Sequence, residues 1–220
     1  MNYCESFCRT IQRLCNNGGG GSILPREYRQ VEYLEATGTQ YIITSVTASS
    51  QLETHCSGTF TRYLDDYAVL VGGRNGTTSQ GRYCAFQFWD NNHRYLSFVY
   101  GDDGTQVYVT AINNPIEIIF NDASHAVYVN GVKRKTWSAS SSAISTANPN
   151  PIHLFHGYGT LYAAGRLNRV TFYNNTTGEK LQDFIPCYRK TDSKPGMYDL
   201  VTNTFFTNAG TGEFTVGPRV

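Results

Sequence analysis

Charged residues and long apolar runs are both scarce in this sequence. Charged side chains make up 16% of the 220 residues, and 18 basic residues nearly balance 17 acidic ones. The net charge of +1 gives no field that could hold nucleic acid or an anionic membrane by charge alone. No apolar run reaches the ~18 residues of a membrane-spanning helix, and the start lacks the basic-then-apolar order of a secretory signal. We therefore expect neither nucleic acid nor a membrane as a partner.

Motifs that indicate catalysis are also missing. The sequence has no Gly-x-Ser-x-Gly motif for a serine nucleophile and no Cys-x-x-Cys pair for zinc. Glycoside hydrolysis needs two carboxylates that face one groove, and residues on one face of a strand are an even number apart. Glu117 and Asp122 are five apart, and His153 and His156 are three apart. Each pair is therefore predicted to project from opposite faces, and we expect no catalytic residue and no enzymatic activity.

Helical periodicity is confined to the N-terminus, in residues 1–17. Apolar residues recur there at intervals of three and four, with cysteines on or beside the same face. That face consists of Tyr3, Cys4, Phe7, Cys8, Ile11, Leu14 and Cys15. A helix of about fifteen residues is marginal on its own in water, so we expect this segment to be an anchor that packs against a partner. For its thiols we expect packing first and a disulfide second, with crosslinking of copies and metal binding as further alternatives.

A glycine-rich linker follows the anchor and separates it from the rest of the chain. Gly18 to Gly21 and Ser22 have the composition of a flexible tether. The same run is common in engineered linkers, so the sequence leaves a natural and an engineered origin open. The predicted organisation is an anchor at 1–17, a linker at 18–22 and one domain at 23–220.

From residue 23 onward the apolar period changes to two, which is typical of half-buried strands. The predicted strands are 41–44, 67–71, 82–89, 95–100, 106–110, 116–120, 126–129, 152–155, 161–164 and 169–173. Predicted turns lie at 72–73, 91–92, 101–104, 130–131 and 174–175, where Gly, Asn and Asp gather. So many short strands, without alternating helices, predict an all-β antiparallel sandwich. We expect fewer than about 15% of the residues to be helical.

Three further cysteines stand alone within the predicted domain. Cys56, Cys84 and Cys187 have no partner at metal-ligand spacing. We expect them to be small buried side chains rather than members of a disulfide.

Several stretches resemble one family of domains. Residues 24–42 resemble the opening of the laminin-G-like, concanavalin-A-like jelly-roll domains of bacteriophage and prophage structural proteins. The closing half of the same domains is similar to 165–173, 181–190 and 196–212, and the Tyr-Val-Asn-Gly hairpin at 126–133 also matches. The resemblance implies a jelly-roll β-sandwich over nearly the whole chain after the linker.

The resemblance also implies a non-catalytic virion protein, present in multiple copies as a capsid decoration, head fibre or tail-associated protein. Such a protein would assemble in the host cytoplasm, bind other virion proteins through residues 1–17, and display a lectin-like surface for host or mucus glycans. The alternative is a bacterial cell-surface carbohydrate-binding or adhesion module. A glycoside hydrolase is a third hypothesis.

Candidate ligand residues are few. Low charge with Tyr, Trp and Asn suits sugar stacking and hydroxyl hydrogen bonds. The glycan candidates are Trp89, Asn91, Asn92 and Trp137, and core packing is the alternative for both tryptophans. Laminin-G-like domains often hold calcium at a sandwich rim, where carboxylate and amide oxygens suit this ion. Asp102, Asp103, Asn121 and Asp122 are possible donors, but their spacing fixes no site, and we predict no cofactor.

Overall fold

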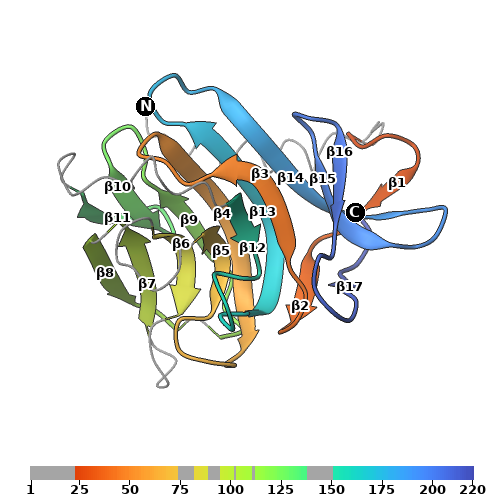
Figure 1. Ribbon diagram of the computed structural model, residues 1–220, viewed down its shortest axis with the longest axis horizontal. Helices are drawn as coiled ribbons and strands as arrows, with labels where there is room; N and C mark the ends of the chain where they lie inside the picture. Colours follow the sequence, from red (N-terminus) through yellow and green to blue (C-terminus); the bar gives the residue numbers. More distant parts are fainter. Residues whose placement is uncertain (1–22, 74–81, 89–94, 102, 111, 138–150) are drawn as a thin grey trace.

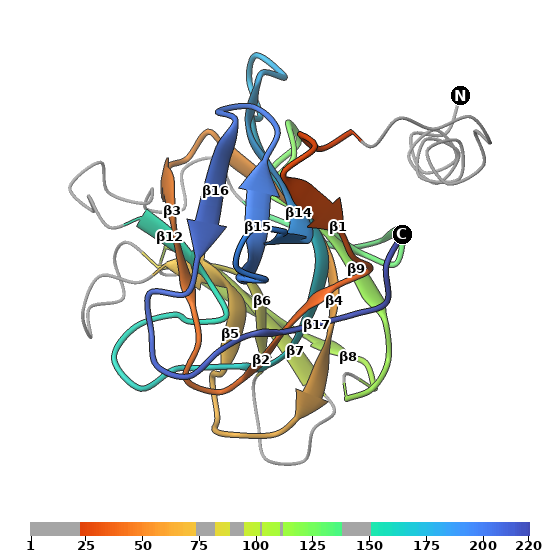
Figure 2. The same cartoon turned by 90° about the vertical axis from the view of Figure 1, so that its right-hand side faces the viewer.

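The computed structural model describes residues 23–73, 82–88, 95–101, 103–110, 112–137 and 151–220. Within these ranges the chain forms strands and turns but no helix, and its two sheets lie face to face (Figures 1 and 2). The predicted antiparallel sandwich is confirmed, and it is compatible with a jelly roll. The predicted N-terminal helix and the linker lie outside the described residues. Nor do the described ranges include a helix that could cross a membrane.

The larger sheet contains 11 strands among the described residues. Its main path is β11-β10-β9-β4-β13-β14-β15-β16, broadly from left to right in Figure 1, with β1 beside β14, β2 beside β13, and β17 beside β2. The bounds are β1 (Tyr28–Gln30), β2 (Leu34–Thr37), β4 (Leu52–Arg62), β9 (Ile116–Phe120), β10 (Ala126–Val129), β11 (Val132–Thr136), β13 (Ala164–Asn174), β14 (Lys180–Arg189), β15 (Pro195–Asp199), β16 (Thr204–Thr207) and β17 (Thr215–Val216).

The smaller sheet has six strands in the described part of the chain, in the order β3-β12-β5-β6-β7-β8. The bounds are β3 (Ile42–Thr47), β12 (Pro151–Leu154), β5 (Val69–Gly73), β6 (Tyr83–Phe88), β7 (Tyr95–Tyr100) and β8 (Asp103–Tyr108). Its edge strand β8 lies at the same end of the sandwich as β11 (Figure 1). Lys135 Nζ on β11 is 2.7 Å from Asp103 Oδ1 on β8, which joins the two sheets at this end.

One hydrophobic core fills the space between the sheets. Phe60 on β4 contacts the rings of Phe86 and Phe88 on β6, with centroids 5.2 and 4.2 Å away. Tyr83 and Phe120 meet edge to face at 4.9 Å, again across the two sheets. All five side chains are fully buried, and each contributes roughly 1.5–3 kcal/mol through the area it removes from water.

Some of the predicted turns are confirmed by the structure and others are wrong. Asn130 and Gly131 have φ of 51° and 75°, so the predicted hairpin between β10 and β11 is confirmed, with the two positive φ values that its turn requires. The predicted turn at Gly72–Gly73 is wrong, because both residues lie in β5. Gly104, predicted to lie in a turn, is in β8. The sequence prediction treated glycine as a sign of a turn, but Gly72, Gly73 and Gly104 lie within strands, whereas Gly131 has the positive φ of a turn.

Candidate functional site

The candidate site is the outer face of β7 and β8. Opposed residues of an antiparallel pair share a face, and Leu96, Phe98 and Tyr100 of β7 point into the core. The alternate residues therefore face outward on both strands. These outward pairs are Tyr95 with Tyr108, Ser97 with Gln106, and Val99 with Gly104.

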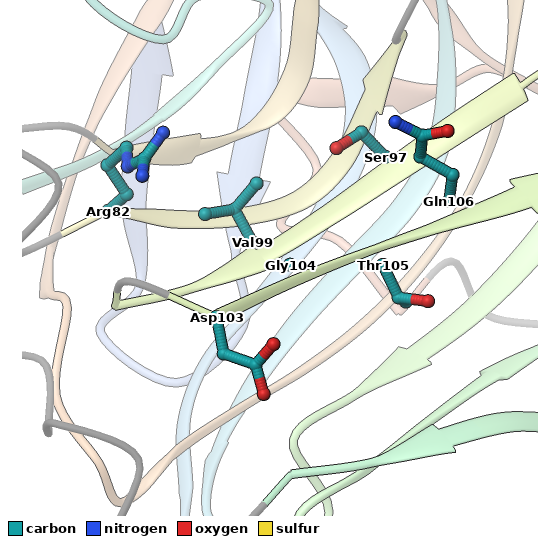
Figure 3. A pocket seen from close by; sticks show the side chains of 7 residues that line it. All are labelled: Arg82, Ser97, Val99, Asp103, Gly104, Thr105 and Gln106. Atoms are coloured by element: carbon teal, nitrogen blue, oxygen red, sulfur yellow. The ribbon is translucent and has the colours of Figure 1, made fainter.

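A shallow pocket of about 450 Å³ lies on this hairpin. It is lined by Arg82, Ser97, Val99, Asp103, Gly104, Thr105 and Gln106. Figure 3 shows the side chains of Arg82, Ser97, Val99 and Gln106 on one side of the strands, whereas Asp103 and Thr105 project to the other. The outward side thus presents a guanidinium, an exposed amide and a partly exposed isopropyl group, whereas Ser97 is buried, at 2% exposure. These groups can donate to and accept from ligand hydroxyls while contacting an apolar ring face.

Two tyrosines extend the site along the same hairpin. Tyr95 and Tyr108 are directly opposed and meet edge to face, with ring centroids 5.5 Å apart. Tyr108 is 61% exposed, more than any other aromatic side chain described in the structure. An exposed phenol ring offers an apolar face with a polar tip, which suits a ligand that is apolar on one side and hydroxylated at its rim.

A second polar cluster lies near the β3 edge of the smaller sheet, where the sequence prediction for the histidines was wrong. His153 Nδ1 and His156 Nδ1 are 2.9 Å apart. Phe155 has a φ of 65°, so the chain leaves strand geometry between the two histidines and the alternation of faces ends there. Tyr41 and Tyr162 pack on His156, with ring centroids 4.9 and 4.5 Å away.

The protons of this histidine pair are fixed by one carbonyl. His156 Nε2 is 3.1 Å from the Gly159 carbonyl oxygen, which only accepts, so Nε2 carries a proton. In neutral His156 the Nδ1 atom is then an acceptor, and His153 Nδ1–H donates to it. Burial, together with the neighbouring His156, lowers the pKa of His153 to about 4. Burial also lowers the pKa of His156, although its hydrogen bond to Gly159 opposes this effect. Both imidazoles are therefore neutral at pH 7.

The predicted glycan residues are placed only in part. Trp89, Asn91 and Asn92 lie outside the described residues. Trp137 is 3% exposed and packs on Tyr100 and Phe120. Its ring cannot stack on a sugar from solvent in this position, so its proposed glycan role is corrected in favour of the core-packing alternative.

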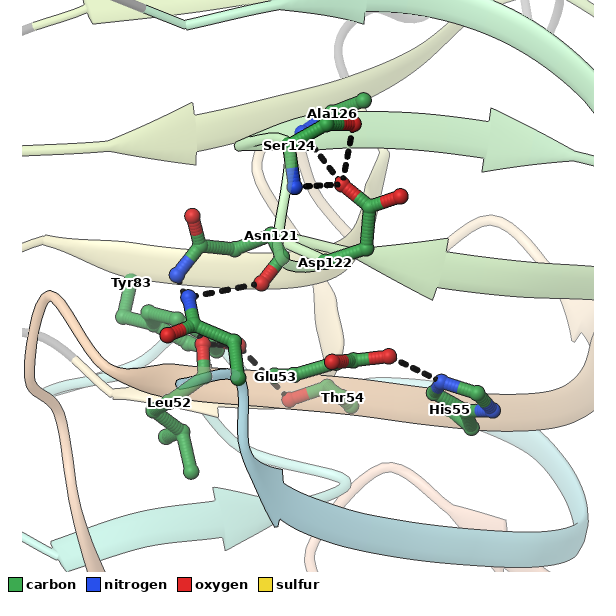
Figure 4. Close-up of polar contacts among 10 residues, drawn as sticks. Leu52, Glu53, Thr54, His55, Tyr83, Asn121, Asp122, Ser124 and Ala126 are labelled. Atoms are coloured by element: carbon green, nitrogen blue, oxygen red, sulfur yellow. Dashed lines mark hydrogen bonds and ion pairs between the residues drawn. The ribbon is translucent and has the colours of Figure 1, made fainter. Parts of the chain in front are cut away.

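The possible calcium donors do not converge. Asp122 Oδ1 accepts from the backbone of Ser124 and Ala126 at 3.0 and 2.9 Å, which orders a turn (Figure 4). Asn121 is fully buried and donates through Nδ2 to the Leu52 carbonyl at 2.7 Å. Asp103 is engaged by Lys135, and Asp102 lies outside the described residues. In the part of the chain that the structure describes, no group of three or more His, Cys, Asp or Glu side chains could hold a metal ion.

The acidic residues considered for catalysis do not share one site. Glu117 is exposed on β9, whereas Asp122 orders the turn after that strand. Glu53 Oε1 lies 2.5 Å from His55 Nε2 on β4 (Figure 4), and the His55 ring packs on Tyr173 at 4.9 Å. The isolated cysteines Cys56, Cys84 and Cys187 are buried, as predicted.

Comparison with known proteins supports the fold. No family model matches the chain, and no curated protein is significantly similar to it. A solved structure of a "putative carbohydrate binding protein" from Bacteroides ovatus is similar over 87% of this chain, with a TM-score of 0.58 and 13% identity. The chain spans 62% of the length of that structure. The shared fold is a two-sheet β-sandwich.

Sequence reasoning missed the β7–β8 site. It predicted β7 in full but began the next strand at residue 106, and it named no tyrosine as a ligand residue. The available signal was alternation: Tyr95 lies an even number of residues from Ser97 and Val99, on the face opposite Leu96 and Phe98. A tyrosine on the polar face of a strand favours a ligand surface over a core position.

Proposed function

We propose that this chain is a non-catalytic, concanavalin-A-like jelly-roll domain that binds carbohydrate on the outer face of β7 and β8. The observation that carries the proposal is the combination, on one face of the sheet, of a pocket lined by the Arg82 guanidinium and the exposed Gln106 amide with an adjacent pair of partly exposed tyrosines. Sugar sites characteristically join polar groups that fix hydroxyls to aromatic faces. The likeness to the Bacteroides protein agrees with this function and fits a carbohydrate-binding or adhesion module.

The geometry favours binding over turnover. The Ser97 hydroxyl and the Gln106 amide are neutral groups, and Asp103, the acid in the pocket lining, projects away from the outward side (Figure 3). Lys135 holds that carboxylate at 2.7 Å. A paired acid directed away from the ligand cannot serve as half of a hydrolytic pair.

The proposal is tested by glycan-array binding of the full chain, followed by titration of the best glycan. Tyr108→Ala should weaken binding about tenfold, equivalent to ~1.4 kcal/mol, because it removes the most exposed ring of the site. Gln106→Ala should weaken it similarly through lost hydroxyl contacts.

The matched control is Tyr158→Ala. Tyr158 is also well exposed, at 45%, but lies in the loop between β12 and β13. The Tyr158→Ala variant should bind the glycan with the affinity of the parent. Full binding by Tyr108→Ala, with loss in Tyr158→Ala, would instead place the glycan near the histidine cluster.

We also propose that residues 1–17 attach this domain to a larger particle, as a virion protein exposed on the particle surface in several copies. The apolar stripe of Phe7, Ile11 and Leu14 supports this second proposal. The two proposals are compatible, since an attached domain can still bind host or mucus glycans.

A further inference from the structure

The glycines within the described strands differ in how much space a side chain would have. A Cβ atom at most of these positions would collide with a neighbour: at Gly165 it would lie 2.6 Å from the Thr59 carbonyl oxygen, and at Gly196 2.2 Å from that of Phe206. Gly58 and Gly72 are similarly closed, with backbone carbonyl oxygens at 2.3 and 2.7 Å, whereas at Gly73 the Cβ atom would make a tight contact of 3.1 Å with the end of the Ile152 side chain. The sandwich therefore requires glycine at Gly58, Gly72, Gly165 and Gly196.

Gly104 on β8 is the exception among the described strand glycines. A Cβ atom there would have its nearest contact at 3.5 Å, the Phe98 carbonyl oxygen, and its next at 4.0 Å, a methyl group of Val99. These are ordinary van der Waals distances, and Gly104 is not among the residues with positive φ. Neither sterics nor backbone conformation requires glycine at this position. Since glycine weakens a strand interior, its presence calls for another explanation.

The position of Gly104 supplies that explanation. It lies on the floor of the pocket, opposite Val99 and two residues from Gln106 on the same face (Figure 3). Lys135 Nζ donates to the Gly104 carbonyl oxygen at 3.1 Å and also holds Asp103. The backbone at the floor is thus held in place while its outward side lacks a side chain. Such an arrangement lets a flat ligand ring approach the strand closely.

We propose that Gly104 forms a sugar subsite in which one ring lies directly over the β8 backbone, and that the ligand is a linear oligosaccharide extending along the hairpin to Tyr108. This inference rests on the proposed carbohydrate-binding function. Tyr108 is four residues from Gly104 on the same face, roughly 14 Å at ~3.4 Å per residue. One sugar ring cannot contact both positions, so the site selects an oligomer over its monomer.

Three substitutions of increasing size test the subsite in the full chain: Gly104→Ala, Gly104→Val and Gly104→Leu. Thermal unfolding should give a melting temperature equal to or above that of the parent, because the added side chain has room and favours the strand. Affinity for the best array oligosaccharide should fall in the same order, reaching at least tenfold for Gly104→Val. Gly165→Ala is the contrast, because its Cβ would clash with backbone and should lower the melting temperature.

The length of the ligand is tested with Tyr108→Ala, titrated with the oligosaccharide and with its constituent monosaccharide. The variant should lose affinity for the oligomer and little for the monomer. A lower melting temperature in Gly104→Val, or unchanged oligosaccharide affinity, would overturn the subsite while leaving the proposed function intact. If the parent chain binds no saccharide, the proposed function and the subsite both fail.

Discussion

At the scale of single residues, the histidine pair has a consequence for stability. In the unfolded chain each imidazole has an ordinary pKa near 6.5 and takes up a proton as the pH falls through that value. In the folded protein burial lowers the pKa of His153 to about 4 and also lowers that of His156. The unfolded state therefore binds more protons in this window, and the free energy of unfolding decreases as pH falls from 6.5 toward 4.

We predict that lowering the pH from 7 to 4.5 destabilises the domain by on the order of 1–3 kcal/mol through this pair, at ~1.4 kcal/mol per unit of pKa shift. The measurement is denaturant unfolding at a series of pH values. The double variant His153→Gln, His156→Gln should lose this part of the pH dependence. Asp183 contributes a separate pH dependence of stability. Burial raises the pKa of this carboxyl, but the ion pairs with Arg169 and Lys180 outweigh that effect and lower the pKa, so this contribution is lost at still lower pH. An unchanged profile in the double variant would contradict the prediction.

The same residues show where sequence reasoning stops. The Asn130–Gly131 turn could be predicted because its requirement for positive φ is written in two adjacent residue types. The contact of His153 with His156 could not, since it depends on a positive φ at Phe155, a residue type that rarely adopts one. Tertiary packing, not local preference, sets that conformation.

At the scale of strands, the main omissions were β14 and β4, and β4 shows one cause. It is the long strand in the middle of the larger sheet, paired with β9 and β13, and its burial alternates along its whole length. Its inward positions include Thr54, Cys56 and Gly58, which do not read as apolar in sequence. Strands with inward Val, Ile or Phe, such as β9 and β10, were predicted to the residue. The alternation of apolar residues therefore did not reveal this strand, because small or polar side chains occupy its inward positions.

The start of β4 depends on a buried amide. Asn121 donates through Nδ2 to the carbonyl oxygens of Ser50 and Leu52, at 3.2 and 2.7 Å, and so ties the end of β9 to the start of β4. Tyr83 also donates to Leu52, at 3.0 Å. The side chain of Asn121 is fully buried, and its φ of 60° suits asparagine.

We predict that Asn121→Leu lowers the free energy of unfolding by on the order of 1–3 kcal/mol, because it removes hydrogen bonds from buried carbonyl groups. Asn121→Gly separates the two causes, since glycine accepts the positive φ but lacks the amide. Chemical denaturation measures both. A variant Asn121→Gly as stable as the parent would show that backbone conformation, rather than the amide, is what the position needs.

At the scale of the whole molecule, composition and strand spacing were sufficient for the class of fold, because low charge, many aromatics and short alternating runs are properties of a sandwich. The candidate site was not predictable in the same way. It arises where β7 and β8 pair in a register that aligns Tyr95 with Tyr108 and Ser97 with Gln106, and a pairing register is a relation between strands. The chemistry of a binding face therefore becomes visible only once the strands are paired.

The last prediction concerns the proposed division between an anchor at residues 1–17 and the domain, and it rests on the proposed attachment to a particle. An amphipathic segment as short as 1–17 cannot order itself in water, yet Phe7, Ile11 and Leu14 would each contribute about 1.5–3 kcal/mol if buried against a partner. Several copies would strengthen attachment further, and the five-residue linker gives a reach of roughly 12 Å. Deleting residues 2–15 should leave a folded domain with unchanged melting temperature that no longer joins the particle.

Single substitutions sharpen this test. Phe7→Asp should lower particle occupancy, measured by quantitative mass spectrometry of purified particles, without changing the melting temperature of the domain. Arg9→Gln changes the charge by the same amount on the opposite face of the predicted helix and should leave occupancy unchanged. If the deleted chain still assembled at full occupancy, the attachment surface would have to be the sandwich itself. The proposed anchoring role of residues 1–17 would then be wrong, and the proposed glycan face would have to lie away from the surface that the particle covers.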